Sequence, residues 1–170
     1  MSLAVEVFNA LYYIFPAYCA NAAPLLFGGG CPIDLGKKFI DGKPIFGRNK
    51  TVRGFIAGLL IGVLVAWAQE SLAPNVGLEK GSVLLGFYLS LGALIGDLTG
   101  SFIKRRLSLK PGAPFPISDQ IDFVLVALLF SLPIKPPTIS FAIIIIVLTL
   151  PIHLLANFIA YLLRLKKSPW

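Results

Sequence analysis

Apolar residues are gathered into five long segments, separated by short polar ones. The segments cover residues 3–27, 54–72, 82–103, 119–134 and 138–163. A helix needs roughly 20 mainly apolar residues to cross a bilayer, and all but 119–134, which Pro133 interrupts, approach or exceed that length. We therefore predict an all-α integral membrane protein with five transmembrane helices in one membrane domain, residues 1–170.

The cations predict the orientation of these helices. Six Lys or Arg residues lie in 28–53, four in 104–118 and three after residue 163, leaving only Lys80 and Lys135 for the other face. Loops rich in Lys and Arg stay in the cytoplasm. The N-terminus is thus expected outside and the C-terminus inside, with long cytoplasmic loops after the first and third helices.

The charged-residue content and the location of the cations indicate what the protein contacts. Charged residues make up 14% of the chain and hydrophobic ones 56%, and the net charge is +7. Soluble domains are roughly 25% charged. Since the cations are confined to loops and the tail, they indicate contact with lipid head groups in the cell membrane and not with nucleic acid.

A stripe of small residues marks the second segment. Gly54, Gly58 and Gly62 recur every four residues, so they share one helix face. Such a stripe lets two helices approach closely, within one chain or in a homodimer.

Carboxylates cluster at the predicted cytoplasmic face. Asp97 lies inside an apolar segment, on the helix face that also carries Gly100 and Lys104, and Asp119 and Asp122 share the first turn of the next segment. Charge at membrane depth is unfavourable and usually marks a functional site. Asp34 and Asp41 lie in the loop at the same face.

These residue types favour phosphoryl or nucleotidyl transfer. His153, the only histidine, falls within a membrane segment, and neither Cys19 nor Cys31 has a local partner. Protein-based acyl transfer is therefore disfavoured, and we expect His153 to be buried or hydrogen-bonded, with proton relay as the lesser alternative. Carboxylates bind Mg²⁺ through hard oxygen ligands, and Lys and Arg bind phosphates.

The central motif resembles that of a known family. Gly96-Asp97-Leu98-Thr99-Gly100-Ser101-Phe102-Ile103-Lys104-Arg105, then Pro111-Gly112 and Asp119-Gln120-Ile121-Asp122, is similar to the signature of phosphatidate cytidylyltransferases. Gln120 stands where that family has Arg, and the Pro/Gly loop lacks its His. The short five-helix form, with Lys50-Thr51-Val52-Arg53-Gly54 in the first loop, resembles the archaeal branch, the CDP-archaeol synthases.

The resemblance implies a reaction and a set of site residues. CTP and 2,3-bis-O-geranylgeranyl-sn-glycerol 1-phosphate would give CDP-archaeol and pyrophosphate, with Mg²⁺. Asp97, Asp119 and Asp122 would hold the metal, and Ser101, Lys104, Arg105 and Lys110 would bind phosphates. Lys50 and Arg53 would bind the CTP phosphates or the lipid head group, and Asp34 and Asp41 would contact ribose or orient the loop.

Two other functions fit parts of this pattern. A CTP-dependent polyprenol kinase would use the same nucleotide at a membrane but would transfer the γ-phosphoryl group. A small ion transporter would place Asp97 along a conduction pathway. The transporter is disfavoured because the charges gather at one face, with little polar character toward the other.

Overall fold

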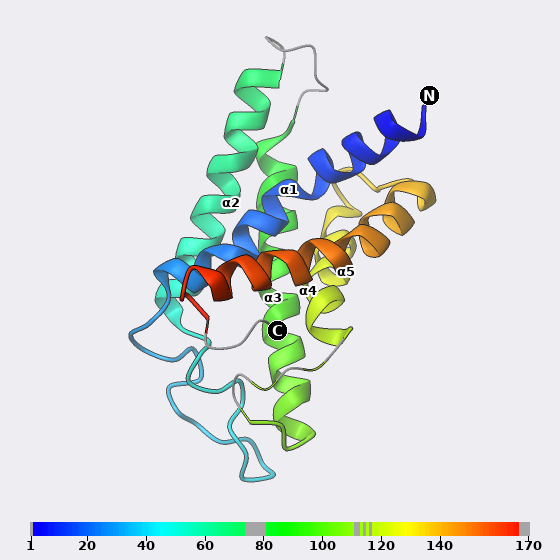
Figure 1. Ribbon diagram of the computed structural model, residues 1–170. Helices are drawn as coiled ribbons and strands as arrows, with labels where there is room; N and C mark the ends of the chain where they lie inside the picture. Colours follow the sequence, from blue (N-terminus) through cyan, green and yellow to red (C-terminus); the bar gives the residue numbers. More distant parts are fainter. Residues whose placement is uncertain (1, 74–80, 111–112, 114, 116, 167–170) are drawn as a thin grey trace.

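The computed structural model describes residues 2–73, 81–110, 113, 115 and 117–166. It contains five α-helices, shown in Figure 1. They are α1 (Leu3–Phe27), α2 (Val52–Leu72), α3 (Val83–Arg106), α4 (Ser118–Ser131) and α5 (Ile139–Leu162). Outside these helices, the described residues contain only turns, irregular segments and two isolated β-bridges, and no strand. The predicted all-α class is therefore confirmed.

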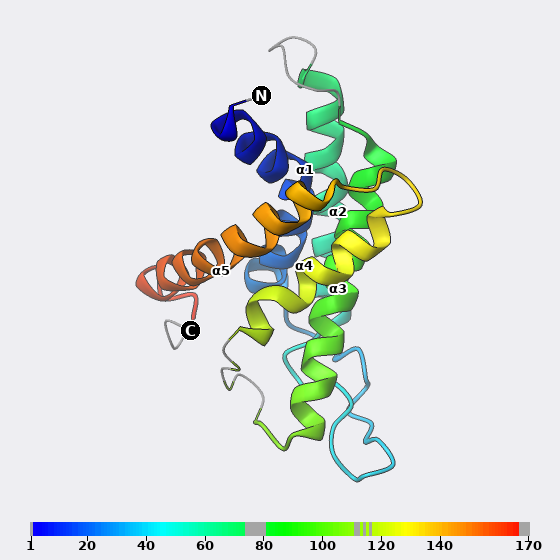
Figure 2. The same ribbon diagram turned by 90° about the vertical axis from the view of Figure 1, so that its right-hand side faces the viewer.

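Helix α3 lies at the centre of the bundle and packs against α4, α2 and α1. The hydrophobic core is built mainly from α1, α3 and α4; buried members include Ile14, Leu89 and Val124. Helix α5 adds Ile145 to this core but buries only two further residues, Thr149 and Ala160. Its C-terminal half projects away from the other helices in Figure 2.

Glycines bring the helices into close contact within the chain. A Cβ at Gly58 would lie 2.7 Å from the carbonyl oxygen of Ala20 in α1, and one at Gly62 would overlap Ser90 in α3. Gly54, Gly58 and Gly62 are all buried. The predicted stripe therefore packs α2 against its own neighbours, and it gives no support to a homodimer.

Among the residues that the structure describes, four helices are long and apolar enough to span a membrane: α1, α2, α3 and α5. Helix α4 has 14 residues, about 21 Å of helix rise, and is shorter than the predicted 119–134 segment. Four apolar spans agree with the prediction of a multi-pass membrane protein, and α4 is a short fifth helix packed along α3.

The start of α2 and the end of α3 differ from the predicted residues. Helix α2 begins at Val52, before the predicted residue 54, because the Thr51 hydroxyl accepts a hydrogen bond from the Gly54 amide at 3.2 Å. Helix α3 continues to Arg106, beyond the predicted residue 103. Lys104, Arg105 and Arg106 are consequently helical residues with fixed directions and do not belong to a loop.

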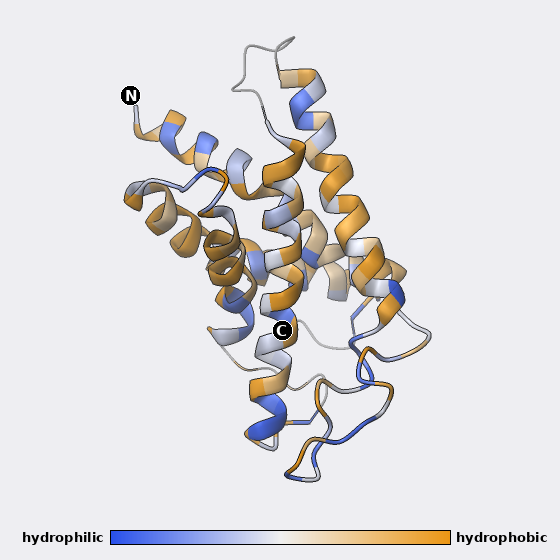
Figure 3. Ribbon diagram, turned by 180° about the vertical axis from the view of Figure 1, so that it is seen from behind, coloured by the Kyte–Doolittle hydropathy of each residue, from blue (hydrophilic) through white to orange (hydrophobic). Residues whose placement is uncertain are grey.

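Hydrophilic residues gather at one end of the molecule. Figure 3 shows them over the connection between α1 and α2 and over the C-terminal end of α3. We call residues 28–51 loop one. Both chain segments that were predicted to face the cytoplasm therefore meet at the same end of the bundle.

Candidate active site

Loop one reaches the middle of the bundle through Lys50. Its ammonium lies 2.6 Å from both carboxylate oxygens of Asp97 on α3. The two side chains keep 26% and 31% of their exposure, so the pair is partly open to solvent. Two residues 47 positions apart in the sequence are thus joined, one in loop one and one nine residues before the C-terminal end of α3.

A second ion pair joins α3 to the start of α4. The Lys104 ammonium lies 2.8 and 2.9 Å from the two oxygens of Asp119, and it also donates to the Ala113 carbonyl at 3.0 Å. The Phe115 amide donates to the same carboxylate at 3.0 Å. Asp119 thereby ties the residues between the two helices to the end of α3.

The third carboxylate is seated against glycine. A Cβ at Gly96 would lie 2.6 Å from the Asp122 carbonyl oxygen, and one at Gly100 would overlap the Asp122 carboxylate. Asp97 lies between these glycines on α3, and Asp122 interacts electrostatically with both Asp97 and Asp119. The glycines of the motif therefore allow the three carboxylates to share one region.

This donor set fits Mg²⁺ by its chemistry, since it consists of hard carboxylate oxygens. Asp97 and Asp119 each hold a lysine in the structure. Across the part of the chain that the structure describes, no three His, Cys or carboxylate side chains are grouped tightly enough to enclose a metal ion. The metal assignment of Asp97, Asp119 and Asp122 therefore stays a prediction.

Asp34 organises loop one. It is 6% exposed and accepts hydrogen bonds from the backbone amides of Gly36, Phe46 and Gly47, at 3.0, 2.9 and 2.9 Å. Burial alone would raise the pKa of this carboxyl, but the three amides outweigh burial and hold its pKa below the usual range. Of the two roles predicted for Asp34, the structure supports orientation of the loop.

Arg106 fastens loop one to the end of α3. Its guanidinium donates to Asp41 at 2.7 Å and to the Pro44 carbonyl. It also lies over the rings of Phe39 and Phe102, 4.9 and 4.8 Å from their centroids. In the sequence Arg106 counted only as one of four cations in 104–118; in the structure it joins α3 to loop one, with Asp41 as one of its partners.

The other predicted phosphate-binding residues lie around these pairs. Ser101 and Arg105 are buried in α3, and Arg105 donates to the Lys110 carbonyl at 3.1 Å, while Lys110 itself is exposed. The Arg53 guanidinium donates to the Phe27 carbonyl at 2.9 Å and to the Gly28 carbonyl, at the end of α1. Arg105 and Arg53 thus brace backbone in this structure.

A cavity of about 600 Å³ opens beside the Lys50–Asp97 pair, and we call it the charged cavity. Loop one supplies Arg48, Asn49, Lys50 and Thr51 to its wall. Helix α5 and the residues after it also line this cavity, among them His153, Asn157 and Lys166. None of these three was predicted as a site residue, although His153 and Asn157 are four residues apart on an otherwise apolar helix, a spacing that places them on one face.

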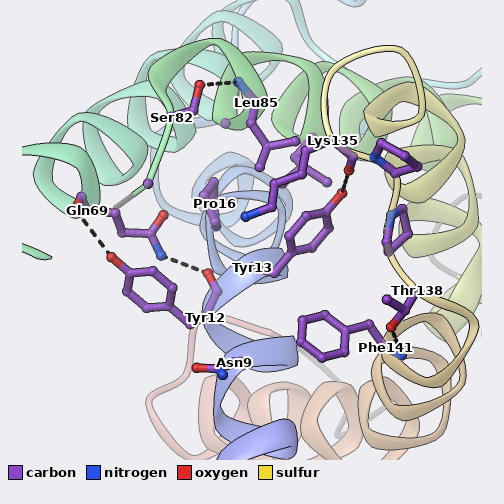
Figure 4. A pocket seen from close by; sticks show the side chains of 15 residues that line it. Asn9, Tyr12, Tyr13, Pro16, Gln69, Ser82, Leu85, Lys135, Thr138 and Phe141 are labelled. Carbon is purple, nitrogen blue, oxygen red and sulfur yellow. Dashed lines mark hydrogen bonds between the residues drawn. The ribbon is translucent and has the colours of Figure 1, made fainter. Parts of the chain in front are cut away.

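A second cavity, of about 250 Å³, is lined by Tyr12 of α1, by Gln69 of α2, and by Ser82 and Thr138, which precede α3 and α5; we call it the tyrosine cavity (Figure 4). Neutral hydrogen bonds cross it. Tyr13 donates to the Lys135 carbonyl at 2.6 Å, and the Gln69 amide donates to the Tyr12 carbonyl at 2.8 Å. The predicted carboxylates are not part of its lining.

Together, the apolar helices and the cluster of lysine–aspartate pairs define a helical membrane protein with a polar, anion-attracting site at one end of the bundle. The family model for CDP-archaeol synthase, described as CarS-like, matches residues 3–170. The chain belongs to the CDP-archaeol synthase family. The resemblance drawn from loop one and residues 96–122 is thereby confirmed, and a cytidylyltransferase is supported over a kinase or a transporter.

Curated relatives of this family are similar to the chain over nearly their whole length. CDP-archaeol synthase from Methanocaldococcus jannaschii is 46% identical, with 96% of this chain and 97% of that protein covered. CDP-archaeol synthase from Thermococcus gammatolerans is 48% identical, with 97% of each covered.

A solved structure has the same fold. It is that of an intramembrane enzyme for archaeal membrane lipids biosynthesis, and it matches with a TM-score of 0.79 at 36% identity. The match covers 89% of this chain and 94% of that one.

Proposed function

We propose that this protein transfers CMP from CTP to 2,3-bis-O-geranylgeranyl-sn-glycerol 1-phosphate, giving CDP-archaeol and pyrophosphate. The observation that carries the proposal is the Lys50–Asp97 pair at the wall of the charged cavity, between a cationic loop and apolar helices. CTP, a nucleoside triphosphate, and the lipid phosphate are both anions, and the lipid also carries long apolar chains. A cavity with cations at one wall and membrane helices at the other suits that combination.

The reaction is a displacement at phosphorus. A phosphate oxygen of the lipid forms a new bond to the α-phosphorus of CTP, and the bond from that phosphorus to the bridging oxygen breaks. The pyrophosphate leaves with the electron pair. Such transfers are accelerated mainly by positioning and by neutralising negative charge.

The residues of the site divide this work. Lys50 and Arg48, which line the charged cavity, and Lys104, which is paired with Asp119, would bind phosphate oxygens of the two anionic substrates. Asp97, Asp119 and Asp122 would hold Mg²⁺, which supplies further charge neutralisation when bound. Asp34 and Arg106 keep loop one folded, so that Lys50 is presented to α3.

The same proposal includes an orientation. The end that carries loop one and the C-terminal end of α3 would face the cytoplasm, where CTP is found, and the N-terminus would lie outside the cell membrane. The support is the excess of Lys and Arg at that end.

The test is an incubation of the detergent-purified protein with CTP, Mg²⁺ and either the geranylgeranyl lipid phosphate or diacyl phosphatidate, followed by mass analysis. We expect a CDP-linked lipid and pyrophosphate, with the isoprenoid lipid preferred. In a parallel incubation with a polyprenol as the acceptor, release of CDP with a phosphorylated polyprenol would instead identify a kinase. Absence of any nucleotide-dependent lipid product from folded protein would reject the proposal.

A further inference from the structure

Three polar residues stand on the α5 side of the charged cavity, and the reaction outlined above gives them no role. His153 and Asn157 belong to α5, and Lys166 follows the end of that helix. All three line the cavity that Lys50 and Asp97 also line.

The three side chains form a directed chain of hydrogen bonds. The Lys166 ammonium donates to the Asn157 carbonyl oxygen at 2.8 Å. The Asn157 amide nitrogen lies 3.3 Å from Nδ1 of His153. An ammonium is a donor only, so it holds the oxygen side of the amide, and the NH₂ side is left to face the imidazole.

This direction determines the tautomer of the imidazole. Because the amide nitrogen of Asn157 is a donor, Nδ1 of His153 must accept, so its lone pair is engaged. The neutral ring then carries its proton on Nε2. His153 is therefore arranged as a hydrogen-bond donor through Nε2 and not as a base. The ring is further held beside Phe123, with centroids 6.0 Å apart.

The charge and lining of the cavity indicate which ligand this donor serves. Arg48, Lys50 and Lys166 face a single carboxylate, Asp97, among the charged residues at the wall, so an anion is favoured. Apolar residues of α1 and α5 line the same space. They are Ala22, Pro24, Leu25, Ile152, Ala156 and Ala160.

An apolar wall from two membrane helices offers a free nucleotide no complementary contacts, whereas it can contact the apolar chains of a lipid phosphate. We propose that His153, oriented by Asn157 and Lys166, donates from Nε2 to the phosphate of the lipid acceptor and holds it on the α5 side of the charged cavity. The nucleotide is then left to the loop-one side, where Arg48 and Lys50 lie. This inference rests on the proposed function, because it assigns one of the two substrates of that reaction.

The decisive experiment compares two amides at position 153. His153→Gln keeps an N–H donor near the place of Nε2, whereas His153→Asn can replace only the Nδ1 side. We expect His153→Asn to raise the KM for the lipid phosphate by about 10- to 100-fold, the size associated with losing a hydrogen bond to a charged group. The KM for CTP and the kcat should change by less than about threefold, and His153→Gln should recover most of the lipid affinity.

A second variant tests the orienting role of Asn157. Asn157→Leu removes the contact to Nδ1 and should raise the lipid KM in the wild-type background. In the His153→Asn background it should add little, since the two residues act through one contact. Additive effects would overturn the orienting role.

Three outcomes would overturn the proposal. An unchanged lipid KM in His153→Asn would remove the contact, and an equal rise in the KM for CTP would assign His153 to the nucleotide. Equal impairment in His153→Gln and His153→Asn would show a packing role. Melting of each variant in detergent verifies that it is folded.

Binding without chemistry separates this inference from the proposed function. Equilibrium binding of the labelled geranylgeranyl lipid phosphate to the protein in nanodiscs, without CTP, should be weakened by His153→Asn and restored by His153→Gln. If the wild-type protein binds the lipid in this way but makes no CDP-lipid, the proposed function fails while the subsite stands. If it makes CDP-lipid while the variants bind the lipid equally, the subsite alone fails.

Discussion

The charged cavity and the tyrosine cavity both border α1, α3 and α5 but satisfy their polar groups in opposite ways. In the charged cavity, side chains pair with one another, as Lys50 does with Asp97 and Lys166 with Asn157. In the tyrosine cavity, side chains bond to backbone carbonyls, as Tyr13 does at Lys135 and Gln69 at Tyr12. Ion pairs near a partly open cavity can exchange partners with an ionic ligand, whereas bonds to backbone hold helices together. We therefore place function at the first cavity and a structural role at the second.

The largest effect is expected at the carboxylate of the charged cavity. Asp97→Asn leaves Lys50 without its counter-charge and removes a predicted metal ligand, so turnover should fall by about 10³-fold, at the upper end of losses seen when one charge-stabilising group is removed. Turnover is measured as CDP-lipid formed per unit time, with the melting temperature in detergent as the control for folding. Turnover within tenfold of wild type would contradict the placement of function at this cavity.

A somewhat smaller effect is expected from filling the space between α3 and α4. Gly96→Ala places a methyl group 2.6 Å from the Asp122 carbonyl oxygen, and overpacking of this kind lowers the free energy of unfolding by about 1–3 kcal/mol. The shift also displaces Asp122, so turnover should fall as well. Thr99→Ala, at an exposed position of the same helix, is the matched control and should change neither melting nor turnover. Wild-type melting in Gly96→Ala would show that the two helices separate easily.

Loosening loop one should affect the nucleotide more than the lipid. Arg106→Lys retains the charge but loses the planar contact with Phe39 and Phe102 and one of the donors to loop one, so the KM for CTP should rise by about tenfold. Cleavage of loop one by a protease should become faster. Lys37→Ala, an exposed cation of the same loop, should leave both measurements unchanged, and a comparable effect there would mean that charge alone is responsible.

The order of loop one should also depend on pH through Asp34. The pKa of this carboxyl is lower in the folded loop than in the unfolded chain, so its stabilising contribution is complete above the unfolded value of about 4 and is lost as the pH falls through the folded pKa. Hydrogen exchange of the Phe46 and Gly47 amides, corrected for the intrinsic rate, should accelerate only in that acidic window. Asp34→Asn should exchange faster at neutral pH and lack the acid-dependent step. Acceleration at higher pH would identify another group.

The smallest effect belongs to the tyrosine cavity. Tyr13→Phe removes the hydrogen bond to the Lys135 carbonyl and should lower the free energy of unfolding by about 1 kcal/mol. The kcat and both KM values should stay within about twofold of wild type, because none of the site residues is touched. A large loss of turnover without a loss of stability would give this cavity a functional role and end the contrast between the two.

Local patterns in the sequence were sufficient for much of the fold. Apolar runs predicted five helices because a bilayer requires length and hydrophobicity that are visible in the chain itself. Glycines spaced by four predicted close packing, and the structure places them against Ala20 and Ser90. The helix ends were less predictable, since they depend on caps such as Thr51 and on where α3 finally stops.

The site was predictable only in part. The motif on residues 96–122 identified the family, because these residues are close in the chain and their types carry the chemistry, while the roles of its carboxylates stay predictions. The roles of Arg106 and of α5 were missed. In the sequence Arg106 resembles any basic loop residue, because its contacts with Phe39 and Asp41 form only when loop one folds onto α3. His153 and Asn157 likewise read as a buried polar pair, because the sequence does not show that they line a cavity with Lys50 and Asp97.

The sequence by itself determined the helical membrane class, the end of the molecule that carries charge, and the family, since each follows from composition, periodicity or a contiguous motif. Only the tertiary structure decided that Lys50 meets Asp97, that Lys104 meets Asp119, and that α5 closes the cavity with His153 and Lys166. Helical periodicity states which residues share a face of one helix. It does not state which helix that face will meet, because the choice depends on the packing of all five together.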